Sequence, residues 1–230
     1  MDKITHEVEV FGVSYDRFML YELHKILVKK YNIKDILEIP SFGAKAAPSL
    51  YSLGFAKLGA NVTIVDANKK MLEYWKELNL DKNLRIRSQK SYDNTNFKDN
   101  NFDLVWNFVT FSYVEDVNKL LAEMFRVTKK YVLIVSCNNF QLGYPWHKIL
   151  HKLYGFKWNH GNNYYNYPWN LKKCLKQVGF KIKEVKEVMD AYQQRYLALM
   201  KEKFVKYISI FHNHGKEAGA SISHPHSQII

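Results

Sequence analysis

The sequence has few cysteines, which stabilise small secreted proteins as disulfides, and it has no long apolar segment of the kind that crosses membranes. Its 230 residues include two cysteines, Cys137 and Cys174, which lie far apart and outside any Cys-x-x-Cys pair. This pattern does not indicate a disulfide framework, so a reducing cytoplasm is the expected compartment. The sequence has no apolar run of about eighteen residues, and its charged N-terminus lacks the form of a signal peptide. We therefore expect no membrane association.

Acidic residues are also scarce, because 34 lysines and arginines face 22 aspartates and glutamates and give a net charge of +12. Such a charge favours acidic partners, nucleic acid among them. The lysines are spread along the chain, however, at positions that suit the solvent-exposed faces of helices, and no nucleic-acid-binding motif accompanies them. The sequence favours a small-molecule partner over nucleic acid.

What the chain does contain is a core-forming composition, 47% hydrophobic and 15% aromatic, arranged as alternating strand and helix patterns. Strands are predicted over 36–39, 62–65, 84–87, 102–108, 131–135 and 180–188. Helices are predicted over 15–31, 45–58, 69–78, 114–127, 146–153 and 169–178. This alternation predicts an α/β fold, with a doubly wound, mostly parallel sheet covered by helices on both faces.

Residues 35–66 form the most informative segment of the chain. An apolar run ending at Glu38 precedes a Ser-Phe-Gly turn, a helical stretch of small residues, and a second apolar run that ends at Asp66. A parallel strand–helix–strand unit places the first turn and the end of the second strand at the same edge of a sheet. Backbone amides and an acidic residue at that edge suit a ligand of the adenosine type.

This segment and the Phe-Asp-Leu-Val-Trp-Asn run at 102–107 resemble class I S-adenosylmethionine-dependent methyltransferases. The resemblance covers roughly residues 15–190 and implies a Rossmann-like fold and S-adenosylmethionine as cofactor. It also implies that Glu38 closes the first strand beneath the cofactor and that Gly43 belongs to the glycine-rich turn. By the same resemblance Asp66 binds the ribose, and Asn107 lies beside the methionine part of the cofactor.

The turn departs from the family pattern of three alternating glycines, because it reads Glu-Ile-Pro-Ser-Phe-Gly-Ala-Lys. Pro40 removes an amide, and Phe42 adds bulk where the backbone normally approaches the ligand. The acid expected near the adenine has Ser91 and Asp93 as its nearest counterparts. A non-catalytic binding protein of the same fold therefore stays open as an alternative.

Each candidate residue also has a structural interpretation. Asp66 could cap the helix that follows, Glu38 could bind turn amides, and Asn107 could satisfy backbone groups at a strand end. Arg126, with the lysines that follow it, is expected to stabilise a helix C-terminus.

The acceptor side is predicted to lie in the aromatic and histidine-rich segment 144–169. Its planar side chains suit a planar or apolar acceptor, which the sequence does not identify. His147 and His151 have the spacing of a helical zinc pair, but no third ligand is evident, so we predict no metal. His147 or His160 could act as a general base, although ordinary packing is the favoured interpretation of all three histidines.

From about residue 191 the sequence resembles galactose-1-phosphate uridylyltransferases, within the histidine-triad superfamily. The resemblance rests on Phe-His-Asn-His-Gly-Lys-Glu-Ala-Gly-Ala-Ser-Ile-Ser-His-Pro-His-Ser-Gln at 211–228. It implies that His226 is a nucleophile, that Gln228 steadies a phosphate and that His224 is a zinc ligand. Asn213 and Ser221 would contact the nucleotide.

The sequence lacks the Cys-x-x-Cys pair that would complete such a zinc site. We therefore expect a fusion, with a methyltransferase-like domain over 1–190 and a uridylyltransferase-like fragment over 191–230. The methyltransferase fold normally ends with an antiparallel strand that the first part lacks, and the β-rich run 206–211 is expected to take its place at the sheet edge. An uncovered edge would favour a homodimer.

Overall fold

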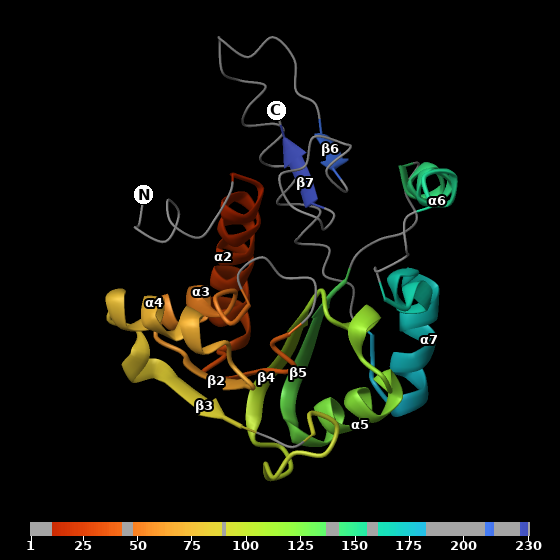
Figure 1. Ribbon diagram of the computed structural model, residues 1–230. Coiled ribbons are helices and arrows are strands. Elements are labelled where there is room, and N and C mark those ends of the chain that lie inside the picture. The colour runs from red at the N-terminus through yellow and green to blue at the C-terminus, as the bar shows by residue number, and fades with distance from the viewer. Residues whose placement is uncertain are drawn as a thin grey trace.

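The computed structural model describes residues 11–42, 48–88, 91–136, 143–155, 161–182, 210–213 and 226–229, with the backbone alone for 11–19 and beyond 182. At its centre is a parallel sheet of five strands in the order β3-β2-β1-β4-β5 (Figure 1). The strands are β1 (Asp35–Glu38), β2 (Asn61–Val65), β3 (Leu84–Arg87), β4 (Phe102–Phe108) and β5 (Thr128–Val135). This is the predicted doubly wound α/β architecture.

Two apolar cores lie on opposite faces of the sheet because neighbouring strand residues point in opposite directions. Ile36 of β1 joins the core beneath α2 (Phe11–Tyr31), α3 (Leu53–Lys57) and α4 (Leu72–Glu77). Leu37 joins the core beneath α5 (Val117–Val127) and α7 (Pro168–Val178). β4 is buried along its whole length, as its continuous apolar run predicts. Figure 1 shows these helices on their two sides of the sheet.

The remaining helices lie at the periphery or are short. α6 (Gly143–Leu153) exposes Trp146, Ile149 and Leu153. The 3₁₀ segments are η1 (Lys69–Met71), η2 (Asp81–Asn83), η3 (Phe111–Tyr113) and η4 (Asn163–Asn166). No helix in the described part of the chain is long and apolar enough to cross a membrane.

Helix ends follow their local chemistry. Asp116 caps α5, since its carboxylate accepts a hydrogen bond from the Lys119 amide at 3.1 Å. Gly179 ends α7 in the left-handed conformation, with φ of 105°. The helix predicted over 45–58 is shorter, because residues 48–52 form turns and only Leu53–Lys57 is helical. Residues 45–47 of that prediction lie outside the described residues.

The C-terminal strands form a second, separate sheet. β6 (Ile210–Asn213) pairs antiparallel with β7 (His226–Ile229), and Figure 1 shows β7 near α2. The expectation that the run 206–211 extends the main sheet is therefore wrong for Ile210 and Phe211. Their backbone hydrogen bonds are made with a strand from their own segment. Residues 206–209, and most of the strand predicted over 180–188, lie outside the described residues.

Candidate functional site

The candidate site lies where β2, β1 and β4 end. Glu38 pairs in register with Ile64 of β2 and with Trp106 of β4, so the residues that follow all three strands meet at one edge. Because parallel strands share this carboxyl edge, it is where ligands bind in open α/β sheets.

Glu38 is fully buried and holds a network beneath this edge. Its Oε2 accepts a hydrogen bond of 2.7 Å from the hydroxyl of Ser52, which itself accepts one of 2.8 Å from the indole Nε1 of Trp106. The network joins β1, β4 and the start of α3. A buried carboxylate needs such donors, and Glu38 thereby positions the elements that surround the turn.

The turn after β1 is joined to the end of β2 by serines. The Ser41 hydroxyl donates to the Asp66 carbonyl at 3.0 Å and is hydrogen-bonded to the Ser49 hydroxyl at 3.2 Å. The Ser49 hydroxyl in turn accepts from the Asn68 amide at 2.9 Å. These bonds fix the backbone on which Asp66 is presented.

Asp66 directly follows β2 and its side chain is exposed. Its amide donates to the Arg87 carbonyl at 2.9 Å, and its φ is +53°. The alternative interpretation, that Asp66 caps the next helix, is not what the structure has. Asn68 is the cap, since its Oδ1 accepts from the amides of Lys70 and Met71.

Asn107 is almost completely buried near the end of β4, 1% exposed. Its Nδ2 donates to the Ile39 carbonyl at 2.9 Å, which satisfies backbone at the end of β1 as the structural interpretation expected. Its Oδ1, however, is buried without a hydrogen-bond partner. A buried acceptor without a donor costs free energy, so this oxygen is suited to an ammonium or amide donor from a ligand.

The bulky part of the turn faces the loop after β3. Phe42 is 37% exposed, so its ring is not buried inside the bend, and it contacts the edge of the Tyr92 ring at 5.4 Å between centroids. The Thr110 hydroxyl donates to the Phe42 carbonyl at 3.0 Å. Ser91 and Asp93 are the two nearest counterparts of the expected adenine acid, and Asp93 accepts a hydrogen bond from the Ser91 hydroxyl. Gly43 lies outside the described residues.

The predicted acceptor segment is only partly described. Tyr144 is buried, and that burial raises the pKa of its phenol to about 12. His147 and His151 both lie on α6, but the side chain of His147, like the whole of His160, lies outside the description. Within the described residues no group of three or more histidine, cysteine, aspartate or glutamate side chains is arranged to hold a metal.

The C-terminal candidates are described as backbone only. His226 pairs with Asn213, and Gln228 pairs with Phe211, in the antiparallel β6–β7 register. Ser221 and His224 lie outside the described residues. The pairing brings together two residues, Asn213 and His226, to which the resemblance gives roles on the same nucleotide.

Sequence reasoning missed the polar residues that support the site. Ser41, Ser49 and Ser52 each hold part of the turn, yet serine in a turn is too common to stand out as a signal. Trp106 carried a usable signal, because a buried indole N–H needs a hydrogen-bond partner.

Comparison with known proteins gives two separate matches along the chain. Residues 46–135 match a family described as a methyltransferase domain. Residues 173–230 match the N-terminal domain of galactose-1-phosphate uridyl transferases. The galactose-1-phosphate uridylyltransferase of Thermotoga maritima is 45% identical over 51 residues, which cover 22% of this chain. The match spans only 16% of the length of that enzyme.

Solved structures share the fold at low sequence identity. A SAM-dependent methyltransferase from Aquifex aeolicus has a TM-score of 0.52 at 18% identity, covering 76% of this chain and 92% of its own. The YcgJ protein from Bacillus subtilis has a TM-score of 0.53 at 14% identity, covering 90% and 93%. The [4+2]-cyclase SpnF also has a TM-score of 0.53, at 16% identity, covering 71% and 59%.

At these identities the structural likeness shows the fold alone. The match over residues 46–135 adds that this part of the chain is similar to a methyltransferase domain. The chain therefore has a Rossmann-like fold whose residues 46–135 match a methyltransferase-domain family, and its residues 173–230 are similar to the N-terminal domain of galactose-1-phosphate uridyl transferases.

Proposed function

We propose that the chain binds S-adenosylmethionine at the carboxyl edge of the sheet and transfers its methyl group to an acceptor. The observation that carries the proposal is the unpartnered Oδ1 of Asn107, which is buried at the end of β4 beside the carbonyl of Ile39. A donor from a bound ligand would relieve the cost of that orphaned acceptor. The residues present therefore fit the cofactor that the family implies.

Each residue has a distinct role in this proposal. Asp66 accepts hydrogen bonds from the ribose hydroxyls, because it is exposed at the end of β2 on a backbone held by Ser41. Asn107 accepts from the ammonium group of the methionine part. When bound, S-adenosylmethionine supplies an electrophilic methyl group on a sulfonium centre. The acceptor then needs positioning in line with that group, and a base where its nucleophile carries a proton.

Calorimetric titration with S-adenosylhomocysteine and with adenosine tests these roles separately. Asp66→Ala removes the carboxylate proposed to bind the ribose. We therefore expect it to weaken the binding of both compounds by about 1–3 kcal/mol. The matched control is Asp81→Ala, which loses the same charge from η2, the segment leading into β3 at the opposite edge of the sheet. We expect the control to bind like the wild type.

Asn107→Leu tests the contact with the methionine part of the cofactor separately from the contacts with the nucleoside. It removes the acceptor, so S-adenosylhomocysteine should bind more weakly by a similar amount, while adenosine should bind unchanged. Wild-type protein that binds neither ligand at millimolar concentration would overturn the proposal. Equal losses for both ligands in the Asn107 variant would contradict the assigned role of this residue.

A second candidate is ligand binding without methyl transfer. It is favoured by the turn, in which Pro40 offers no amide and Phe42 contacts Tyr92, and by a fold relative that is named as a cyclase. The two candidates differ in turnover. A methyltransferase releases S-adenosylhomocysteine from S-adenosylmethionine in the presence of one of a panel of phenols, aromatic amines and thiols, whereas a binding protein does not.

A further inference from the structure

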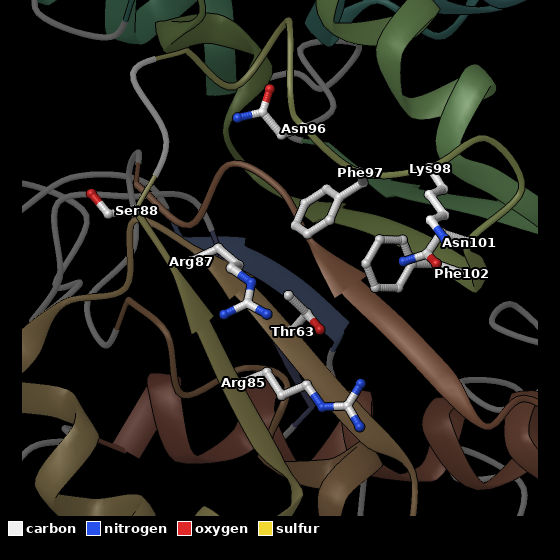
Figure 2. Close-up of a pocket in the computed structure, with 9 residues that line it drawn as sticks. All are labelled: Thr63, Arg85, Arg87, Ser88, Asn96, Phe97, Lys98, Asn101 and Phe102. Atoms are coloured by element: carbon white, nitrogen blue, oxygen red, sulfur yellow. The ribbon is translucent and has the colours of Figure 1, made fainter.

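A basic hollow lies on one face of the sheet and adjoins the candidate cofactor site at Arg87, whose carbonyl accepts a hydrogen bond from the Asp66 amide. In the described part of the connection from β3 to β4, which lacks residues 89 and 90, the chain forms bends and turns and no helix. One face of β2 and β3 thus borders a hollow of about 580 Å³, whose floor includes Thr63 and whose walls come from β3 and from residues 96–102 (Figure 2).

Three cations line this hollow, and no carboxylate lines it. Arg85 and Arg87 come from β3, and Lys98 comes from the loop on the opposite wall. Residues two apart on a strand share one face and lie about 7 Å from each other. Among the described residues none of these three cations has an ion-pair partner, whereas Arg126 on α5 pairs with both Glu123 and Asp99. The cations are therefore available to an anionic ligand.

The other lining groups suit the phosphate backbone and the bases of a nucleic-acid strand. Each guanidinium presents a planar fork of N–H donors that matches phosphate oxygens. Asn96 and Asn101 add amide groups, and Phe97 is a half-buried aromatic ring that lines the hollow. Cationic walls combined with an aromatic surface are the features that bind single strands without reading their sequence.

The wall that carries Asn96, Phe97 and Lys98 is held in place. Arg126 donates to the carbonyls of Phe97 and Thr95, at 2.8 and 3.1 Å, and to the Asp99 carboxylate at 2.6 Å. Glu123 accepts from the Thr95 amide at 2.9 Å. The opposite wall is a sheet strand. Both walls are thus fixed before a ligand arrives, which lowers the entropic cost of binding.

We propose that this hollow binds the backbone phosphates of single-stranded nucleic acid through Arg85, Arg87 and Lys98. The proposal does not rest on methyl transfer, since the residues that line the hollow do not include Glu38, Asp66 or Asn107, although the backbone of Arg87 is hydrogen-bonded to that of Asp66. The net charge of +12 draws the same ligand to the surface from a distance.

Fluorescence anisotropy with a labelled oligouridylate of about 12 nucleotides tests the proposal. Arg85→Gln combined with Arg87→Gln should weaken binding by about tenfold or more and lower the slope of log K against log salt by about 1.4, because two phosphate contacts are lost. The matched control is Lys173→Gln combined with Lys176→Gln, which removes two charges from exposed positions on α7 and should change affinity less than about twofold. Unchanged melting temperatures show that the variants fold.

Further variants and ligands decide between the outcomes. Lys98→Gln on the opposite wall should also weaken binding, whereas an excess of S-adenosylhomocysteine should leave it unchanged. Equal losses in the β3 and α7 variants would overturn the proposal, because they would show general electrostatic attraction. Competition by S-adenosylhomocysteine, uridine monophosphate bound as tightly as the oligonucleotide, or no binding by the wild type would overturn it as well.

Discussion

His24 shows how a single residue shapes the interface between the leading helix and the sheet. Its ring is fully buried, neither ring nitrogen has a hydrogen-bond partner, and it stacks on Phe55 with 3.6 Å between ring centroids. A Cβ added at Gly54 would lie 2.4 Å from the imidazole Nδ1, so only glycine fits opposite the ring. Burial lowers the pKa of His24 from 6.5 to about 3, which keeps the ring neutral in the folded protein.

This burial predicts a pH-dependent loss of stability. Between pH 6.5 and about 3 the unfolded chain binds a proton at His24 that the folded chain does not. The free energy of unfolding therefore falls as the pH is lowered through this window, by up to about 1.4 kcal/mol per pH unit. Urea unfolding at several pH values should show a shallower fall for His24→Leu than for the wild type. Parallel curves for the two proteins would contradict the assignment.

At the scale of elements, Arg126 fastens the β3–β4 connection to α5. The expected role was electrostatic stabilisation of a helix C-terminus, but the side chain binds Glu123 through two hydrogen bonds and reaches the backbone of residues 95 and 97. Burial alone would raise the pKa of Glu123, yet the hydrogen bonds from Arg126 and Thr95 hold it below its usual range. The buried carboxylate therefore stays ionised and paired.

Replacing Arg126 with methionine should destabilise the protein by about 2 kcal/mol, because the buried Glu123 loses its cation while solvent screens the exposed part of the pair. The amides of residues 95–99 should also exchange hydrogen faster. Lys119→Met is the matched control, since it removes an exposed ion pair with Asp116 on the same helix and should cost less than about 0.5 kcal/mol. If urea unfolding gave similar losses of unfolding free energy for the two variants, the contacts of Arg126 would contribute no more than an exposed ion pair.

Elements with strong local patterns were predictable from the sequence. β3 and β4 have the predicted bounds, since their runs are bordered by polar residues, and Gly179 marks the end of α7. The partner of β6 was not predictable, because the choice of pairing depends on distant residues. The basic hollow was missed because Arg85 and Arg87, taken alone, are typical of an exposed edge strand.

The sequence predicted the positions of site residues that lie at strand ends. It did not predict the roles of residues whose hydrogen-bond partners are distant in the sequence. Asp66 and Asn107 lie at the strand ends as predicted. Neither the bond from Asn107 to Ile39 nor the capping of η1 by Asn68 has a unique local signal, because asparagine occurs at many strand and helix ends.

At the scale of the whole molecule, the two sequence matches do not follow the structural units. The uridylyltransferase match begins at residue 173, inside α7. That helix nevertheless packs into the core beneath β1 and β4 through Leu171 and Cys174. The division at residues 190 and 191 therefore stays a proposal, and the activity of the complete uridylyltransferase cannot be transferred to a segment that spans 16% of it.

We expect no uridylyl transfer to His226. A nucleophilic histidine needs neighbouring groups that fix its tautomer and hold the phosphate, and the sequence lacks the Cys-x-x-Cys pair of the related site. Incubation with UDP-glucose followed by intact-mass measurement should show unmodified protein. The contrary result would be an added uridylyl group in the wild type that disappears in His226→Ala.

The position of β1 in the middle of the sheet sets an order in which the chain can fold. Ile36 pairs with both Val62 and Leu104, and the Asp103 carboxylate accepts from the amides of Lys34 and Asp35 while it pairs with Lys130. During synthesis β1 and β2 can associate early, but the other side of β1 stays open until β4 has left the ribosome. Such distant pairings close slowly. The nascent chain thus presents an apolar strand edge for a long interval, which is the interval in which a chaperone would protect it.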